Sequence, residues 1–414
     1  MSVSEWREVR IGDIGDVVTG KTPSSKNPEY FGDEIPFVTP TDYKNYHKNI
    51  YSSERYLSQA GKEVLGNKLL PINSVIVTCI GSDMGKVAIN KVECITNQQI
   101  NSIILKRDLA DSDFIYYTLI SMQEYLKMLA RGGTTMPIVN KSTFEEIKLL
   151  LPPFPEQKAI AATLSALDDM IELNNQINKT LEEMAQAIFK SWFVDFEPFK
   201  DGEFENSELG LIPKGWRVGM LGDFVEIVDN RGKTPPLSDV KTEYPIIDVR
   251  ALSGESRVID YSNCTKYVEK EIYDSWFRSG HPKHLDILIS TVGSIAEMKM
   301  FYGNKGCIAQ NVVAFRSNGI SPCYLYQYLQ YSKGDLLSYN IGSVQPSIKV
   351  THVIKYKIIV PDEKTMSSFD MLMESISDQI HRNANESQIL IAIRDTLLPK
   401  LISGEIRVPV EEVV

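Results

Sequence analysis

The sequence lacks any run of about 18 consecutive apolar residues, so no membrane-spanning helix is expected. Its first residues, MSVSEWREVRIGD, are polar and acidic, unlike a secretory signal peptide. Cysteine is also scarce: the 414 residues include five, widely spaced and without a CxxC pair. This pattern predicts reduced thiols, most of them in the core, in a cytoplasmic protein. The five are Cys79, Cys94, Cys264, Cys307 and Cys323.

No cluster of basic residues marks a nucleic-acid surface, and the formal net charge is −10 at pH 7. The acidity is unevenly distributed along the chain. Residues 155–206 carry a net charge of −7 and residues 362–414 carry −5, whereas residues 1–154 carry −1 and residues 207–361 carry +3. A phosphate-binding surface is therefore compatible with the two less acidic segments. The two acidic segments suit solvent or a basic protein partner, and they would repel DNA.

Neither proline nor glycine occurs between Glu156 and Phe196. Apolar residues recur there at alternating spacings of four and three, which form the seam of a coiled-coil helix. About 40 residues at about 1.5 Å each make a rod of roughly 60 Å. A rod of this length with one apolar stripe needs a partner helix. Its seam positions are Ile160, Leu164, Leu167, Ile171, Asn174, Asn178, Leu181, Ile188 and Trp192.

The predicted partner helix lies in the same chain, from about Thr365 to Ile402, and repeats this seam at a constant offset of 209. Its positions are Phe369, Met373, Ile376, Ile380, Asn383, Ser387, Leu390, Leu397 and Leu401. Polar residues interrupt both seams at the same place. If the helices pair antiparallel, Asn178 faces Asn383 and Asn174 faces Ser387. A buried Asn pair would fix the register of the helices; the alternative is that these residues only lie at a wet seam.

The segments before the two helices repeat each other as well. Both copies contain a Gly-Lys-Thr-Pro segment (20–23 and 232–235) and a strand running into a Gly-Ser turn (74–82 and 286–294). A Gln-Gln or Gln-Asn pair (98–99 and 310–311), a predicted helix (114–129 and 324–337) and a hairpin with Gly, hydroxyl and Pro residues (133–137 and 342–346) follow in each copy. The duplication indicates one internal repeat of a globular segment and a long helix.

The predicted fold is therefore α+β, with two mixed α/β globular domains separated by two long α-helices. The helices are expected to pair as an antiparallel coiled coil with an internal pseudo-twofold repeat. The predicted division is residues 1–154 and 207–361 for the globular domains, and 155–206 and 362–414 for the helical segments. Glycine, proline and acidic residues at 198–215 predict a flexible joint between the halves.

Several motifs, in this order and in duplicate, carry a family resemblance. Trp-x-x-x-x-(Leu/Ile)-Gly-Asp begins each globular segment, at Trp6–Asp13 and Trp216–Asp223, and Leu151–Gln157 (LPPFPEQ) precedes the first helix. The second copy departs from the pattern, because Val360–Lys364 replaces the Pro-Pro-x-x-Glu-Gln run. The segment Leu398–Ile406, near the end of the chain, is a further motif that contributes to the resemblance. Essentially the whole chain resembles the specificity subunit of Type I restriction-modification systems.

The resemblance implies that each globular domain is a target recognition domain reading one half of a bipartite target in double-stranded DNA. The helices would fix the spacing of the halves and dock two methyltransferase (modification) subunits, and motor-nuclease (restriction) subunits would join this core. The chain itself would hold no catalytic residue, metal or cofactor. S-adenosylmethionine, ATP and Mg²⁺ would bind to the partner subunits. Two linked readers should demand a fixed half-site separation, because groove faces recur with every turn of DNA.

Residues that contact DNA need cations and hydroxyls for phosphates, and paired donors or acceptors for base edges. The polar, turn-like segments of both copies supply such side chains. The alternative is that these segments are structural turns required by the fold. The candidates are Lys21, Thr22, Ser24, Thr41, Tyr43, Ser82, Arg131, Thr134 and Thr135 in the first copy, and Arg231, Lys233, Thr234, Arg250, Ser294, Ser343 and Gln345 in the second.

Two segments imitate enzyme motifs. Asn27–Tyr30 resembles the Asn-Pro-Pro-Tyr motif of adenine methyltransferases, but Glu29 replaces the second proline and no glycine-rich cofactor loop precedes it. Gly81–Val87 imitates a phosphate-binding loop, but its spacing is one residue short and Val87 replaces Ser or Thr.

Two possible metal sites are also weak. Asp286, Glu297 and Lys299 imitate a metal-dependent nuclease triad, which the first copy does not share. His281 and His284 have a spacing compatible with a metal on a helix, but the proline between them favours a surface loop.

Other functions are distinguished by what the chain would do. A chain with its own catalytic activity would cleave or methylate DNA alone, and a pure scaffold would give its partners no sequence preference. A Type II system with a fused nuclease-methyltransferase would differ in its partner chains.

Overall fold

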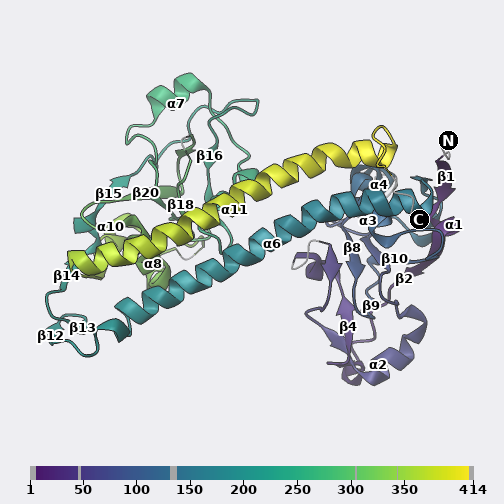
Figure 1. Ribbon diagram of the computed structural model, residues 1–414, viewed down its shortest axis with the longest axis horizontal. Coiled ribbons are helices and arrows are strands. Elements are labelled where there is room, and N and C mark those ends of the chain that lie inside the picture. The colour runs from purple at the N-terminus through teal and green to yellow at the C-terminus, as the bar shows by residue number, and fades with distance from the viewer. Residues whose placement is uncertain (1–5, 45–47, 131–137, 304, 343, 410–414) are drawn as a thin grey trace. The chain divides into compact units, whose positions relative to one another are not determined.

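The computed structural model describes residues 6–44, 48–130, 138–303, 305–342 and 344–409. The chain forms two compact units: Met1–Ile171 with Ile389–Val414 (the first unit), and Glu172–Gln388 (the second unit). Each unit contains one globular domain and a part of each long helix (Figure 1). The predicted division into four consecutive segments (1–154, 155–206, 207–361 and 362–414) stays a prediction, because each compact unit combines segments that are distant in sequence.

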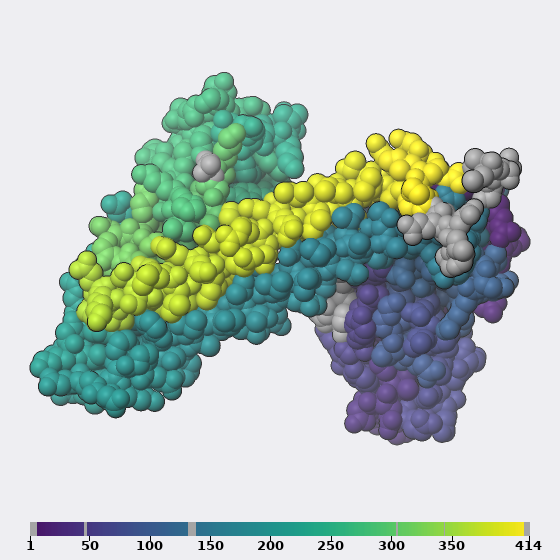
Figure 2. All heavy atoms as spheres, in the orientation of Figure 1, coloured from purple at the N-terminus to yellow at the C-terminus, as the bar shows by residue number. Residues whose placement is uncertain are grey.

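Two long helices, α6 (Phe154–Phe193) and α11 (Glu363–Ser403), confirm the predicted rods. In each unit the two helices lie side by side and run antiparallel (Figures 1 and 2). In the first unit Arg394 of α11 forms a 2.8 Å ion pair with Asp168 of α6. In the second unit the ring centroids of Phe193 and Phe369 are 4.9 Å apart. Every predicted seam side chain is buried or half-buried, so the 4-3 spacing identified the contact face.

The polar interruption of the seam is a side-chain hydrogen bond. Asn383 donates its Nδ2 to Oδ1 of Asn178 at 2.9 Å, and Asn178 donates to the Ile380 carbonyl at 3.2 Å. The predicted pairing of Asn178 with Asn383 is therefore confirmed. Asn174 has a different hydrogen-bond partner from the predicted Ser387: its Nδ2 donates to Oε2 of Glu386 at 3.0 Å. A charged acceptor makes the stronger bond, which favours the carboxylate over a hydroxyl.

The first globular domain is built on a five-stranded sheet with the order β2-β10-β7-β8-β5. A smaller four-stranded sheet has the order β3-β6-β4-β9, and β1 pairs with β11 beside the start of α6. The strands are β1 (Arg7–Arg10), β2 (Gly15–Thr19), β3 (Phe31–Gly32), β4 (Ile35–Val38), β5 (Asn49–Ile50), β6 (Tyr56–Leu57), β7 (Val75–Thr78), β8 (Val87–Asn90), β9 (Ile95–Thr96), β10 (Ile100–Leu105) and β11 (Lys148–Leu151). The helices are α1 (Ile11–Ile14), α2 (Gln59–Val64), α3 (Ser112–Ser121), α4 (Gln123–Ala130) and α5 (Lys141–Glu145).

The second globular domain repeats this plan, with a four-stranded sheet of order β15-β20-β17-β18. The short strands β16 and β19 pair in parallel, and β14 pairs with β21 at the start of α11. The strands are β14 (Arg217–Met220), β15 (Val225–Val228), β16 (Ile246–Ile247), β17 (Ile287–Ser290), β18 (Met298–Met300), β19 (Cys307–Ile308), β20 (Val312–Ser317) and β21 (Lys357–Val360). The helices are α7 (Lys270–Trp276), α8 (Pro322–Tyr331), α9 (Lys333–Ser338) and α10 (Val350–Val353).

Two details differ from the sequence-based expectation. Each predicted helix of the globular domains is a pair of short helices, α3–α4 and α8–α9, because ψ at Met122 and Ser332 is near zero and closes the first helix of the pair. The predicted flexible joint is instead folded into the hairpin β12 (Phe204–Ser207) and β13 (Gly210–Pro213). Buried Ile212 anchors this hairpin in the core of the second unit, which explains its order.

The chemistry of the core agrees with the cysteine pattern. All five cysteines are buried free thiols, which confirms their predicted place in the core. Burial raises the pKa of the Cys79 and Cys94 thiols to about 12, so both are protonated at neutral pH. Within the described ranges, no helix combines the length and the apolar character needed to span a bilayer.

Candidate nucleic-acid interface

In the first domain, polar loops meet where β4 and β9 end. These two strands run parallel, and Asn97 after β9 donates its backbone N–H to the Val38 carbonyl at 3.1 Å. The Gly-Lys-Thr-Pro loop lies against the same turn, since the Lys21 N–H donates to the Thr96 carbonyl at 2.9 Å. A Cβ on Gly20 would lie 2.3 Å from the carbonyl oxygens of Thr96 and Asn97. Glycine is therefore required for this close approach.

The Gly-Ser turn after β7 joins the same cluster of loops. The Thr78 hydroxyl accepts from the Lys86 N–H at 3.0 Å and donates to the Asp83 carbonyl, which closes the turn. Gly81 has φ +88° in the left-handed region that favours glycine. Cys79 donates its backbone N–H to the Gln99 carbonyl at 2.7 Å, and this bond ties the turn to the loop after β9.

The second domain assembles the same loops from corresponding residues. Ser290 takes the role of Thr78: its hydroxyl accepts from the Glu297 N–H at 2.8 Å, and Gly293 has φ +87°. The Thr291 N–H donates to the Asn311 carbonyl at 2.7 Å, as Cys79 does to Gln99. Both repeats therefore place one set of three loops at the same end of their central sheet.

The cations of these loops differ in how they are paired. Arg231 lies 2.6 Å from Asp229 and donates to the Thr291 hydroxyl at 3.4 Å. The hydrogen bond from Arg231 lowers the pKa of the Asp229 carboxyl. Arg250 forms a 3.2 Å ion pair with Asp248. Lys21 and Lys233 are exposed, and within the described part of the chain neither ammonium has a carboxylate partner. Both lysines are therefore available to a phosphate.

Most of the predicted DNA-contact residues lie at the surface of this loop cluster or beside it. Thr41 and Arg250 occupy corresponding 3₁₀ turns, η2 (Pro40–Lys44) and η6 (Val249–Leu252), each of which is separated by one residue from the end of β4 or β16. The other predicted residues with exposed or half-buried side chains are Lys21, Thr22, Ser24, Ser82, Arg231, Lys233, Thr234, Ser294 and Gln345. Arg131, Thr134, Thr135 and Ser343 lie outside the described residues.

Tyr43 corrects one prediction. Its side chain is 8% exposed and packs in an apolar cluster with Val38, Ile50 and Leu70. Desolvation by this burial raises the pKa of its phenol well above the usual value of 10. A buried phenol in such a cluster is not available at the surface, so the predicted direct contact of Tyr43 with DNA is wrong. The aromatic ring instead completes the core beneath the loops.

Sequence reasoning missed a buried cation that joins each domain to the helices. Lys48 of the first domain donates to the Ser165 hydroxyl of α6 at 2.6 Å, and Arg257 of the second domain forms a 2.7 Å ion pair with Glu182 of α6. Lys48 and Arg257 are separated by 209 positions, the offset of the helical repeat. That coincidence is the signal that could have identified them. The sequence shows Gln98 and Gln310 at corresponding repeat positions, but it does not indicate their hydrogen bonds to Thr22 and Thr234.

The residues that imitate enzyme sites have other partners. Asp286 forms a 2.8 Å ion pair with Arg316, and Glu297 forms one of 3.1 Å with Lys333. Lys299 is buried and donates to the carbonyls of Gly254 and Ser256. The three residues that imitate a nuclease triad therefore belong to three separate interactions. Among the described residues, no group of three His, Cys, Asp or Glu side chains is placed to hold a metal ion.

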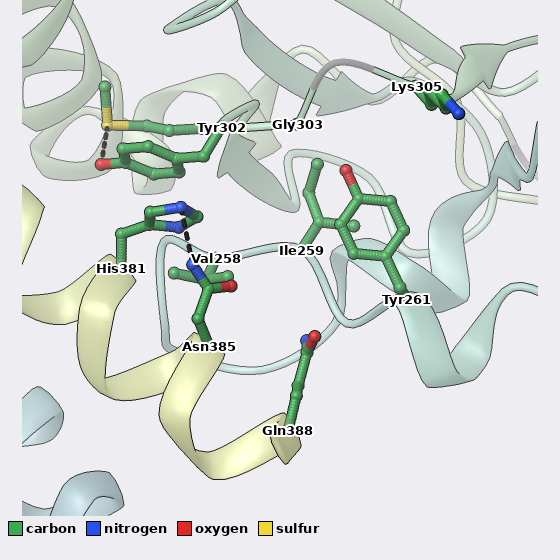
Figure 3. A pocket seen from close by; sticks show the side chains of 10 residues that line it. Val258, Ile259, Tyr261, Tyr302, Gly303, Lys305, His381, Asn385 and Gln388 are labelled. Atoms are coloured by element: carbon green, nitrogen blue, oxygen red, sulfur yellow. Dashed lines mark hydrogen bonds between the residues drawn. The ribbon is translucent and has the colours of Figure 1, made fainter. Parts of the chain in front are cut away.

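A cavity of about 450 Å³ lies between α11 and the second domain (Figure 3). His381 of α11 stacks on Tyr302 with centroids 4.5 Å apart, and it pairs with Asn385 at 2.9 Å. Desolvation by burial lowers the pKa of the His381 imidazole, which favours its neutral form. The ring centroid of His284 lies 5.8 Å from that of Tyr302, whereas His281 stacks on Tyr273. The two histidines therefore serve separate aromatic contacts.

Comparison with known proteins identifies the family. The sequence profile described as the Type I restriction modification DNA specificity domain matches residues 3–183 and 213–389. The MjaIX Type I restriction enzyme specificity subunit of Methanocaldococcus jannaschii is 32% identical over 426 residues, covering 98% of this chain and 94% of that protein. The HindI specificity subunit of Haemophilus influenzae is 22% identical over 480 residues, covering 98% and 100%.

The fold has a counterpart among solved structures. The S subunit of a Type I restriction-modification system from M. genitalium aligns with a TM-score of 0.56 at 18% identity, covering 97% of each chain. The profile matches twice, once for each globular domain with adjoining helix, which agrees with the internal repeat. Because the profile covers most of the chain and a relative at 32% identity spans nearly all of it, the chain belongs to the family of Type I restriction-modification specificity subunits.

Proposed function

We propose that the first globular domain reads one half of a bipartite DNA target and the second domain reads the other half. One observation carries this proposal: both repeats place the same three loops at the same end of the sheet, with an exposed lysine in each. Phosphate contacts from such lysines would set the register, and neighbouring polar side chains would read base edges. The near-neutral charge of the domains is compatible with DNA, unlike that of the acidic helices.

The proposed partners are two methyltransferase subunits docked on the long helices, with restriction subunits added to that core. The outer face of α6 supports this assignment. Leu173, Ile177 and Met184 are 48%, 38% and 49% exposed and follow one face of the helix, because spacings of four and eleven return to nearly the same angle. At offset 209, α11 has polar Arg382 and Glu386 in place of the first two. An exposed apolar stripe of this kind suits a protein partner.

The chemistry is assigned to those partners. S-adenosylmethionine would be held by the methyltransferase subunits, and ATP with Mg²⁺ by the restriction subunits. This chain would supply only position and sequence preference. Purified alone, it should neither methylate nor cleave DNA, and methylation or cleavage by the isolated chain would contradict this division of labour.

A methylome tests the proposal directly. The chain is co-expressed with its methyltransferase partner in a host without adenine methylation, and modified adenines are mapped by single-molecule sequencing. The expected result is a motif of two short blocks separated by a fixed unspecified gap. A stable complex that methylates without any such motif would contradict DNA reading by this chain and favour a scaffold.

Exchange of one domain tests independent readout. Replacing residues 1–154 by the corresponding segment of another specificity subunit should change one block of the motif and leave the other unchanged. The matched exchange of residues 207–361 should change only the second block. If either exchange altered both blocks, the two domains would not read their halves separately.

A further inference from the structure

A hydrogen bond between two exposed side chains occurs at the same place in both repeats. The Thr22 hydroxyl donates to Oε1 of Gln98 at 2.6 Å in the first domain. In the second domain, Gln310 donates its Nε2 to the Thr234 hydroxyl at 2.5 Å. Both partners are shifted by 212 positions between the repeats. An exposed hydrogen bond contributes little net stability, so its duplication suggests a role other than stabilising the fold.

Each bond joins the Gly-Lys-Thr-Pro loop to the turn that carries the glutamine. The proline of the loop, Pro23 or Pro235, is buried and anchors the loop in its domain. The lysine two positions before it, Lys21 or Lys233, is exposed. The threonine between them is thus the point at which the loop is fixed close to its charged end.

We propose that these two hydrogen bonds are latches that hold Lys21 and Lys233 in position to contact backbone phosphates of duplex DNA. The inference rests on the DNA-reading function proposed above and assigns Thr22, Gln98, Thr234 and Gln310 as positioning residues. A loop that is already ordered loses less conformational entropy on binding, so its lysine binds phosphate more tightly. Since phosphate contacts fix the register of a reader, a latched loop also aligns the neighbouring base-reading side chains.

The two Gly-Lys-Thr-Pro loops differ in the other hydrogen bonds that hold them in place. In the first repeat, backbone bonds from Gly20 to the Ile100 carbonyl (3.1 Å) and from Lys21 to the Thr96 carbonyl (2.9 Å) also hold the loop. For residues 232–235, all of which the structure describes, no backbone hydrogen bond to the turn at 308–312 is found. Gly232 has φ +120°, and a Cβ there would meet nothing within 4 Å. The side-chain latch therefore matters more in the second repeat.

The test measures binding of the assembled methyltransferase complex to a duplex carrying its methylome motif, as a function of salt. Removing one phosphate contact reduces the slope of log K against log salt by about 0.9. Between 50 and 200 mM salt, this corresponds to about 3.5-fold less loss of affinity. Lys233→Gln is expected to show this change, and Thr234→Val should reproduce it although no charge is removed. Thr234→Ser, which retains the hydroxyl, should restore the wild-type slope.

The double variant Lys233→Gln/Thr234→Val separates positioning from direct contact. If Thr234 acts through Lys233, the double variant equals Lys233→Gln alone. Additive effects would mean that Thr234 contacts DNA itself, and a Thr234→Val variant with a wild-type slope would show a structural bond only; either result overturns the latch. Thr22→Val is the matched control and should change the slope less than Thr234→Val does. Failure of the wild-type complex to prefer its motif duplex over a scrambled one would instead refute the proposed function itself.

Discussion

Arg257 and Glu182 form an ion pair that joins the second globular domain to α6 in a region closed to solvent. The Arg257 side chain is 1% exposed and the Glu182 side chain is 8% exposed. The guanidinium Nη2 lies 2.7 Å from Oε2, Nε donates to Oε1 at 3.0 Å, and the Arg257 backbone N–H donates to Oε1 at 2.7 Å. The guanidinium also donates to the Ser377 hydroxyl of α11 at 2.5 Å. One side chain of the domain therefore holds both helices.

The first domain uses its corresponding cation in a different way. Lys48 pairs with Asp113 of its own domain at 2.5 Å and reaches α6 only through the Ser165 hydroxyl. Its ammonium lies 4.9 Å from the centroid of the Tyr117 ring, as the Arg257 guanidinium lies 5.2 Å from that of Tyr326. The cation and its aromatic neighbour are thus repeated, whereas the carboxylate that neutralises the cation comes from a different element in each domain.

Removing Glu182 should strongly destabilise the second unit, because Arg257 would remain buried without a counter-charge. Glu182→Ala is expected to lower the free energy of unfolding by about 3–5 kcal/mol. Urea unfolding followed by tryptophan fluorescence is suitable, since Trp192, Trp216 and Trp276 all lie in the second unit. The neighbouring exposed Glu183→Gln is the control and should change little. A double Glu182→Met/Arg257→Met variant should recover much of the loss; an equally unstable double variant would mean that packing rather than charge pairing dominates.

Because the ammonium of Lys299 is buried, the stability of the protein should depend on pH in the alkaline range. Desolvation by burial lowers the pKa of its ammonium from 10.5 to about 8. Between these values the unfolded chain binds more protons at this site than the folded chain, so stability contributed by Lys299 rises with pH over that interval and is lost as pH falls towards 8. Relative to Lys299→Met, the wild type should gain stability between pH 8 and 10, by an amount of order 3 kcal/mol.

The measurement is the difference in free energy of unfolding between the two proteins at several pH values. Groups that titrate equally in both proteins cancel in this difference. Lys266 is an exposed lysine of the same domain, and Lys266→Met should show no such pH dependence. A constant difference between wild type and Lys299→Met from pH 7 to pH 10 would show that Lys299 titrates normally in the folded protein.

Removal of the Asn178–Asn383 bond should reduce the specificity of helix register, and not only the stability of the protein. Asn178→Leu leaves the Asn383 amide without its acceptor and should cost about 1–3 kcal/mol. A double Asn178→Leu/Asn383→Leu variant should recover stability while permitting other helix registers and self-association. Urea unfolding and light scattering measure the two properties, and exposed Asn175→Ala serves as control. A monodisperse, monomeric double variant would argue against a role of the pair in register.

The outer stripe of α6 predicts where a methyltransferase subunit docks. Ile177→Glu introduces a charge at the centre of the stripe and should weaken assembly by about tenfold or more, since a buried large apolar side chain contributes about 1.5–3 kcal/mol. The thermal stability of the free chain should change little because Ile177 is partly exposed. Co-purification and titration calorimetry with the partner measure the effect. Arg382→Gln, at the exposed repeat position of Leu173 on α11, is the control; unaffected assembly of Ile177→Glu would place the docking surface elsewhere.

Much of the architecture was predictable because its signals are local. A seam at spacings of four and three specifies one face of a helix, and Asn178 and Asn383 lie on the faces that this rule assigns to them. The duplicated Gly-Lys-Thr-Pro and Gly-Ser segments likewise indicated which turns matter. The prediction for Tyr43 was wrong because a tyrosine in a polar segment is expected to be exposed, whereas its ring packs against Val38 and Ile50.

By itself, the sequence determined two globular domains, two paired helices, their repeat and the family to which the chain belongs. It did so because periodicity and motif order depend only on positions along the chain. Only the tertiary structure decided which charges and hydroxyls meet, such as Arg257 with Glu182 and Thr234 with Gln310. These partners are 75 and 76 residues apart, and no local pattern encodes the folding path that brings such distant side chains together. The distinction between a paired cation and one free to bind phosphate therefore arises only in the folded chain.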